Sequence, residues 1–338
     1  MTGDRTVSVP ATDPAEMMSH REDLTDAERH YIRSARSTNT MRGYQSDWKE
    51  WCAWCHARRT SPQPAAPTNI SQYLTELAGH GAKVGTMSRR LSSIRFAHRV
   101  KNLPDPTTDA RVATVWEGIR RDKGAPPEQA DPLMPPELNR VLELCPTIRS
   151  WKNNRADEPH LGGLRDRALL TIGFFGALRR SEIAAITTDH IETSEQGLVL
   201  HIPSSKTNQY RDQDELIILP RSRDPLLCPV TNLNHWLEHA GQQPGPLLRQ
   251  VTRHNTLGGP LSTTSINNIV QNAIRRAGVT GRYSAHSLRA GFVTFAHLRG
   301  ASERAIAHQT RHHSLATLNQ YVRINDIWID NAATQLGL

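Results

Sequence analysis

Apolar residues recur at helical spacing in four segments of the first half of the chain, between residues 38 and 123. In chain order these positions are Tyr44, Trp48, Trp51, Cys52 and Cys55; Ile70, Tyr73, Leu74 and Leu77; Met87, Leu91 and Ile94; and Val112, Val115 and Ile119. A period of three to four residues is typical of a helix that buries one face. We therefore predict four helices, the first capped within residues 38–40 and the third capped by Thr86.

The second half of the chain combines helical periods with two short apolar runs. Helices are predicted near residues 136–144, 165–175, 229–240 and 264–277, and a further helix carries Arg179 and Glu182. The runs GLVLHIP (197–203) and ELIILP (215–220) predict the two strands of a β-hairpin. The expected fold class is mainly α with a small β-hairpin or sheet, in which a helical domain is joined to a mixed α+β domain.

A proline-rich segment separates the two halves. GAPPEQADPLMPPE (124–137) holds five prolines and few apolar residues, so it predicts a stiff, extended connector. A chain of 338 residues is also too long for one ordinary core. We predict a flexible N-terminal tail at 1–37 with a short helix within it, a helical domain at 38–123, a linker at 124–136 and a second domain at 137–338.

Charge and cysteine content narrow the class of protein. A net charge of +8 and a pI near 9.6 favour a polyanionic partner, nucleic acid before membrane. The chain has no run of 18 apolar residues, and its acidic, proline-interrupted start is unlike a signal peptide. Four cysteines are too few for a disulfide framework, so a reducing cytoplasm is expected. The C-x-x-C-H run at 52–56 is also a haem-attachment pattern, but without an export signal both cysteines are expected to be core residues.

Positive charge gathers on the third predicted helix and at the end of the fourth. Between residues 83 and 123 there are ten Lys or Arg against four Asp or Glu, and three arginines face away from the apolar stripe. Such a run is usually a solvated helix face. The third helix carries no carboxylates to pair with its arginines, however, which favours contact with DNA phosphates. The candidate DNA-contact residues are Lys83, Arg89, Arg90, Arg95, Arg99, Arg120 and Arg121.

Candidate chemistry is concentrated in residues 283–323. His286 and Arg289 are three residues apart and can share one helix face, His312 follows, and Tyr321 comes nine residues later. Guanidinium forks bind phosphate oxygens, imidazoles move protons near neutral pH, and a phenol can become a covalent nucleophile. This combination suits chemistry on a phosphodiester.

The pattern H-x-x-R, then H, then Y nine residues on resembles the carboxyl-terminal half of the tyrosine recombinases, the phage-integrase family. An earlier arginine motif of that family is matched by LRRSEI at 178–183, and its hairpin lysine by Lys206, which is the only lysine after Lys152. The resemblance implies a helical core-binding domain, similar to that of the Cre subgroup, joined to a catalytic domain. One departure is Arg311, because the family commonly has glycine before the third-motif histidine.

The resemblance also implies site-specific DNA recombination that needs neither a metal nor another cofactor. The implied catalytic residues are Arg179, Lys206, His286, Arg289, His312 and Tyr321, with Glu182 behind them. Tyr321 would be the nucleophile, leaving a 3′-phosphotyrosyl link and a free 5′-hydroxyl. Lys206 would be the general acid, since a desolvated lysine can lose its proton and an arginine effectively cannot. The two arginines and the second histidine would contact phosphate oxygens, the first histidine would move protons to and from the phenol, and the glutamate would orient basic neighbours.

Several alternatives stay open. A type IB topoisomerase uses much the same residues but rejoins the same strands, and a regulator on the same fold would bind DNA without cleaving it. His308 and His312, four apart on a possible helix face, could begin a metal site, although a third ligand and a catalytic glutamate are not evident. The resemblance implies double-stranded DNA with inverted-repeat half-sites as partner, and a homotetramer assembled from monomers on DNA at the nucleoid. The apolar segment 327–338 would pack on its own domain or dock on a neighbouring protomer.

Overall fold

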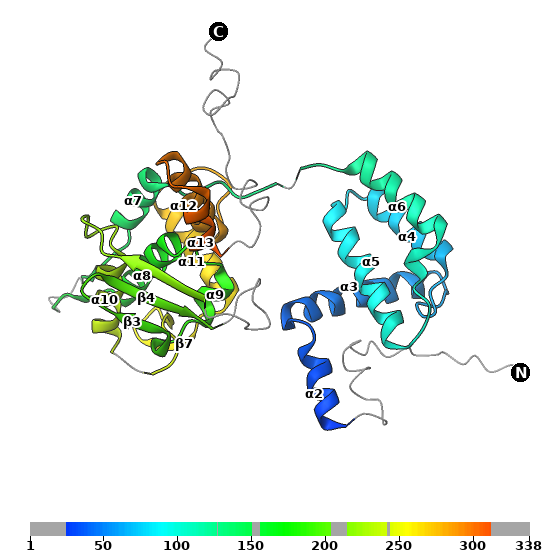
Figure 1. Ribbon diagram of the computed structural model, residues 1–338, viewed down its shortest axis with the longest axis horizontal. Helices are drawn as coiled ribbons and strands as arrows, with labels where there is room; N and C mark the ends of the chain where they lie inside the picture. Colours follow the sequence, from blue (N-terminus) through cyan, green and yellow to red (C-terminus); the bar gives the residue numbers. More distant parts are fainter. Residues whose placement is uncertain (1–24, 127, 151–155, 204–214, 242–243, 312–338) are drawn as a thin grey trace, which may run out of the picture. The chain divides into compact units, whose positions relative to one another are not determined.

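The computed structural model describes residues 25–126, 128–150, 156–203, 215–241 and 244–311. The chain divides into two compact units, Met1–Pro127 and Glu128–Leu338, which Figure 1 traces in colour. Each unit has a hydrophobic core of its own and is taken separately. Within the described ranges, no helix combines the length and the apolar character needed to cross a bilayer.

The first unit is helical throughout its described part. Its elements are α2 (Asp26–Ser34), α3 (Thr38–Ala57), α4 (Pro67–Gly79), α5 (Val84–Val100), the 3-10 turn η1 (Pro106–Thr108) and α6 (Ala110–Lys123). The four helices predicted between 38 and 123 are confirmed, and α2 is the short helix expected near the start. Both predicted caps were wrong. Ser37 caps α3 by accepting a hydrogen bond from the Thr40 amide, and α5 starts before Thr86 without a side-chain cap.

The core of this unit is built from the predicted apolar faces. Its most deeply buried side chains include Trp51, Cys55, Ile70, Leu74, Met87 and Ile94. The Trp51 indole nitrogen donates to the carbonyl oxygen of Pro62 at 3.0 Å, so this buried polar atom has its partner. Cys52 and Cys55 pack in the same core as free thiols, and burial raises the pKa of each to about 11. These contacts confirm the prediction of core cysteines.

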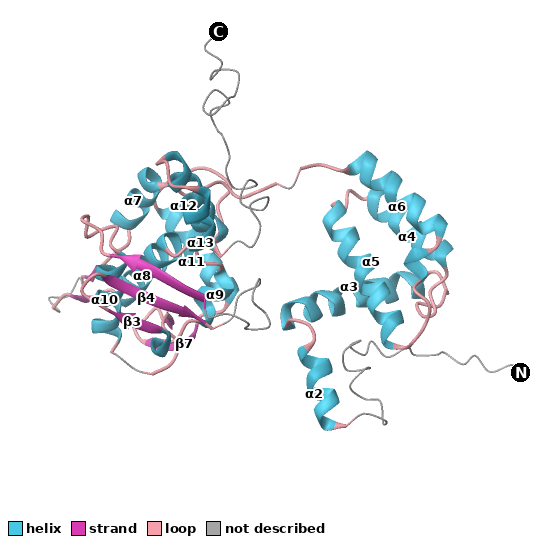
Figure 2. Ribbon diagram, viewed as in Figure 1, coloured by secondary structure: helices cyan, strands magenta, loops and turns pink. Residues whose placement is uncertain are grey.

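The second unit surrounds one central helix with others and adds small antiparallel sheets (Figure 2). Its helices are α7 (Pro135–Glu143), α8 (Leu161–Phe175), α9 (Arg180–Ala185), α10 (Pro229–Ala240), α11 (Thr263–Arg276), α12 (His286–Leu298) and α13 (Glu303–Thr310). Helix α8 is buried on nearly all sides and contacts both α10 and α12, which explains its almost unbroken apolar sequence. The predicted fold class, mainly α with a small sheet, is confirmed.

The largest sheet has three strands in the order β3 (Ile191–Thr193), β4 (Gly197–Ile202) and β5 (Glu215–Pro220). The hairpin predicted from two apolar runs is confirmed as β4 and β5, paired so that Leu200 lies opposite Ile217. Alternate side chains of both strands are buried, and β5 packs against α10. The sequence did not indicate β3, nor the strands β1 (Ile148–Arg149), β2 (Glu158–Pro159), β6 (Arg249–Val251) and β7 (Leu257–Pro260), nor the 3-10 turn η2 (Thr188–His190). These elements are too short for a period to show.

Candidate functional site

Arg179 lies at a tight turn between two helices of the second unit. After α8 ends, Ala177 has a φ of 45°, a left-handed conformation that is unfavourable for any residue with a side chain. The turn makes Arg179 the N-cap of α9, whereas the sequence placed it inside a helix. Glu182 accepts hydrogen bonds from the Arg179 backbone nitrogen at 2.8 Å and from its Nη1 at 2.7 Å. The Glu182 side chain is fully buried and that of Arg179 is 17% exposed, so the carboxylate fixes an arginine that still reaches solvent.

Arg289, on α12, is completely buried where two helix ends meet. Its Nη1 donates to the carbonyl oxygen of Ala177 at 2.6 Å, and its Nη2 donates to that of Thr310 at 2.5 Å. Thr310 ends α13, whose last carbonyls lack partners within the helix and carry the negative end of its dipole, so a cation is favoured there. Arg289 thereby joins α12 to the ends of α8 and α13. Because it has no exposed surface, a phosphate can reach it only after neighbouring groups move.

Arg311 is a second buried arginine in the same cluster. It ends α13 in the left-handed conformation, with φ of 55° and ψ of 45°. Its Nη2 donates to Glu182 Oε2 at 2.6 Å, and its Nη1 donates to the carbonyl oxygens of Gln309 at 2.9 Å and Gly176 at 3.3 Å. Its Nε lies 3.8 Å from Glu215 Oε2. The backbone conformation explains why glycine is favoured at such a position, but the sequence did not indicate the contacts of the side chain.

His286 is the first residue of α12, and its ring reaches solvent. Partial desolvation lowers the pKa of His286, and the positive charges of Arg289, Arg179 and Arg180 lower it further. The imidazole is therefore neutral at pH 7 and able to accept a proton.

Four of the predicted site residues lie in one region of the described structure: Arg179, Glu182, His286 and Arg289. Lys206, His312 and Tyr321 lie outside the described residues, as does the apolar segment 327–338. His308 lies on α13, which ends at Thr310, and His312, its partner in the metal alternative, lies outside the described residues.

The basic helix α5 of the first unit meets carboxylates from other elements. Arg89 donates from Nε and Nη2 to Asp47 at 2.6 and 3.0 Å, and Arg90 donates to Glu50 at 2.5 Å. Both acids come from α3. Helix α5 itself carries no carboxylate, as noted from the sequence, but carboxylates distant in sequence pair with both arginines. DNA contact by these residues stays a prediction.

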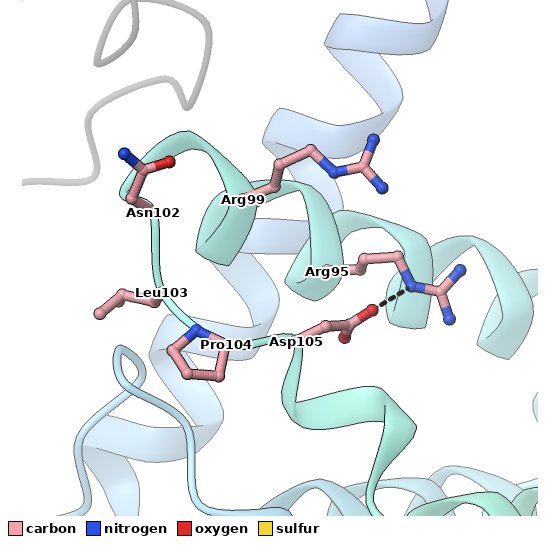
Figure 3. Close-up of a pocket in the computed structure, with 6 residues that line it drawn as sticks. All are labelled: Arg95, Arg99, Asn102, Leu103, Pro104 and Asp105. Atoms are coloured by element: carbon pink, nitrogen blue, oxygen red, sulfur yellow. Dashed lines mark ion pairs between the residues drawn. The ribbon is translucent and has the colours of Figure 1, made fainter.

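Two further arginines of α5 line a shallow pocket with the loop that follows the helix (Figure 3). The pocket residues are Arg95, Arg99, Asn102, Leu103, Pro104 and Asp105. Arg95 pairs with Asp105 at 2.8 Å and also donates to the hydroxyl of Thr107. Arg99 is exposed and forms no ion pair within the described part of the chain. Of the two, Arg99 has the charge that is more available to an anion.

Comparison with known proteins gives matches over both units. The family model described as "Phage integrase family" matches residues 152–327, and "Phage integrase, N-terminal SAM-like domain" matches residues 29–101. An integrase/recombinase xerD homolog of Selenomonas ruminantium is 31% identical over 324 residues, which cover 94% of this chain and 91% of the relative. The recombinase cre of Escherichia phage P1 is 27% identical over 253 residues, covering 73% of this chain and 68% of the relative.

Solved structures agree on the fold. The Tn1549 transposon integrase in complex with transposon right end DNA aligns with a TM-score of 0.61 at 12% identity, over 96% of this chain and 99% of that one. A lambda integrase tetramer bound to a Holliday junction aligns with a TM-score of 0.57 at 15% identity, over 85% of this chain and 72% of that one. The family match over the second unit and the full-length relative lead to one conclusion: the chain belongs to the phage integrase family.

Proposed function

We propose that the chain cleaves and rejoins DNA strands through a covalent bond between Tyr321 and a 3′-phosphate. The relatives that the chain matches include proteins named tyrosine recombinases. The chain is a site-specific DNA recombinase of that class. The assignment of residues is supported above all by the cluster around Glu182. There a buried carboxylate fixes the partly exposed Arg179, whose guanidinium can bind a phosphate oxygen, and the buried Arg289 belongs to the same region.

Proton transfer in the proposed reaction uses three side chains. The Tyr321 oxygen attacks phosphorus while the bond from phosphorus to the 5′-oxygen breaks. His286 accepts the phenol proton, and Lys206 donates a proton to the departing 5′-oxygen. A 5′-hydroxyl from another strand then attacks the phosphotyrosyl bond in the reverse reaction. Because the bond energy is kept in that link, rejoining needs no ATP.

Charge on the phosphate is compensated by the cationic side chains. Glu182 fixes the Arg179 side chain, which would contact one non-bridging oxygen. Arg289 would contact the other oxygen after the groups that bury it move. His312 would add a hydrogen bond. Preorganised donors of this kind act most strongly where water is excluded, since the charge that develops in the transition state is then poorly screened.

Recombination can be distinguished from strand passage by one experiment. Inverted repeats in the DNA that flanks the gene supply a candidate target, and supercoiled DNA is prepared with two copies of it or with none. A recombinase rearranges the first substrate and hardly relaxes the second. Equal relaxation of both substrates would instead indicate a topoisomerase of the IB type, and binding without cleavage would indicate a regulator.

The pH dependence of cleavage should report His286. A base must be neutral to accept a proton, so the rate falls as the pH falls through the pKa of His286. That pKa is lowered from 6.5, so the acid limb of kcat/KM lies below the ordinary histidine range. Arg180→Gln removes one of the repelling charges and should move the acid limb to higher pH. An exposed arginine far from the cluster, Arg221, provides the control, since Arg221→Gln should leave the profile in place. An unmoved acid limb in Arg180→Gln would remove His286 from the role of base.

Salt dependence should show which arginine of α5 contacts DNA. Arg99→Ala removes a charge without an ion-pair partner among the described residues, so the log–log slope of binding against salt should flatten by about one unit. Arg95→Ala should change the slope less, because Asp105 already offsets the charge of Arg95. Circular dichroism checks that both variants are folded. An unchanged slope in Arg99→Ala would mean that this helix face is only solvated.

The proposal also covers the form of the DNA site, the number of subunits on it and the role of each segment of the chain. The partner is double-stranded DNA with inverted-repeat half-sites, on which four monomers assemble as a homotetramer, and the protein acts at the nucleoid in the cytoplasm. The lambda integrase structure, a tetramer bound to a Holliday junction, supports this arrangement by analogy. The helical segment 38–123 would bind DNA, the segment 137–338 would carry catalysis, and residues 124–136 would link them.

A further inference from the structure

Arg311 connects three segments of the candidate site through one guanidinium. It donates to Glu182 on α9, to the carbonyl oxygen of Gly176 at the end of α8, and lies within ion-pair distance of Glu215 at the start of β5. Glu215 is the first described residue after the segment that holds Lys206, and Arg311 directly precedes His312 in the sequence. The Arg311 guanidinium thus contacts α9, the end of α8 and the start of β5.

The burial of Arg311 is unusual in two respects. Its side chain is only 5% exposed, and its burial lowers its pKa while Glu182 opposes that effect. Its backbone is left-handed, a conformation in which glycine or asparagine is unstrained and arginine is not. A buried charge in a strained conformation is unfavourable unless its contacts compensate. Here the compensating group is Glu182, whose fully buried carboxylate accepts from Arg179 on Oε1 and from Arg311 on Oε2.

Glu182 is the link between Arg311 and the phosphate-binding side chain. Its Oε1 accepts from the Arg179 guanidinium, and its Oε2 accepts from both the Arg179 backbone nitrogen and the Arg311 guanidinium. With Arg311 removed, Oε2 would lose its cation and the carboxylate would be free to bind the Arg179 fork with both oxygens. Arg179 would then be withdrawn from a phosphate, because its donors would be occupied.

We propose that Arg311 is a positioning residue for strand cleavage, which holds Glu182 so that Arg179 keeps donors available for the scissile phosphate. The proposal rests on the proposed function, and it assigns Arg311 no contact with DNA. An Arg311 variant should therefore lose binding to the non-bridging phosphate oxygens. That loss should occur only when Glu182 is present.

The test measures the single-turnover rate of covalent adduct formation on a nicked suicide substrate, with half-site affinity and melting temperature measured in parallel. Arg311→Asn keeps a residue that tolerates the left-handed backbone and removes the cation. It should slow adduct formation roughly 10- to 100-fold, and in the Glu182→Gln background it should add little, because both changes interrupt the same contact. Arg304→Gln, at an exposed position of α13, is the matched control and should react at the wild-type rate.

A substrate with a 5′-bridging sulfur separates this role from one at the leaving group. The sulfur needs no proton to leave, so it should not restore the rate of Arg311→Asn. If Arg311→Asn does not fold, Arg311→Lys takes its place. Lysine keeps the positive charge but lacks the bidentate guanidinium, so a smaller loss of rate is expected. A wild-type rate in the variant, an equal loss in both backgrounds or rescue by sulfur would each overturn the proposal. Absence of any adduct with the wild-type protein would instead contradict the proposed function.

Discussion

Tyr321→Phe is expected to abolish the covalent protein–DNA adduct and to leave DNA binding unchanged. The substitution removes one hydroxyl group, so the atom that would bond to phosphorus is absent while the size and apolar surface of the ring remain. The arginines proposed to bind phosphate and the basic face of α5 are untouched. Trapping on a nicked suicide substrate, followed by denaturing electrophoresis, measures the adduct, and a gel-shift assay measures binding.

Tyr283 provides a matched control within the same unit. It is half-buried, and burial raises its pKa, with the negative charges of Glu137 and Asp131 adding to the effect. A phenol whose raised pKa keeps it in its neutral form is a poor nucleophile, so Tyr283→Phe should form the adduct at the wild-type level. An adduct that persists in Tyr321→Phe and disappears in Tyr283→Phe would reverse the assignment.

The helices were predictable because their cause is local. Burial of one face leaves a period of three to four residues in the sequence, and Met87, Leu91 and Ile94 of α5 show it directly. The hairpin was predictable for a similar reason, since β4 and β5 each hold four Leu, Ile or Val residues in six positions. The chemistry-bearing residues were indicated by their spacing, which a family resemblance made interpretable.

The contacts that arrange the site were not predictable, because they join residues far apart in the chain. Arg89 meets Asp47 from 42 positions away, and Arg311 meets Glu182 across 129. The periodic spacing of apolar residues in the sequence does not indicate such pairs. Arg311 is instructive, since in the sequence it was only a substitution for a common glycine. Its left-handed backbone accounts for the glycine, and its contact with Glu182 accounts for the arginine.

The predicted ends of helices were also inaccurate, because the residue at which a helix begins or ends depends on single hydrogen bonds. Arg179 was placed inside a helix, yet the left-handed turn at Ala177 makes it the N-cap of α9. The difference matters for function. At an N-cap the backbone nitrogen of Arg179 is free of the helical ladder, so Glu182 can bind both that nitrogen and the guanidinium.

Lys206→Ala is expected to slow cleavage by about 10²–10⁴-fold, the range for loss of a general acid. The hairpin of β4 and β5 frames the segment that holds Lys206, and Glu215 at the start of β5 meets Arg311 of the arginine cluster. A proton donor in the segment between these strands would serve the 5′-oxygen as it leaves. The arginines of the cluster cannot replace it, because a guanidinium effectively never gives up its proton.

A 5′-bridging sulfur substrate gives this prediction its decisive measurement. A thiolate is a good leaving group without protonation, so the substrate should restore most of the rate to Lys206→Ala. The same substrate should restore little to Arg179→Ala, whose loss lies at a non-bridging oxygen. The two variants therefore serve as controls for each other: rescue of Lys206→Ala alone supports a general acid. If neither variant is rescued, Lys206 binds the phosphate and another group, or water, protonates the 5′-oxygen.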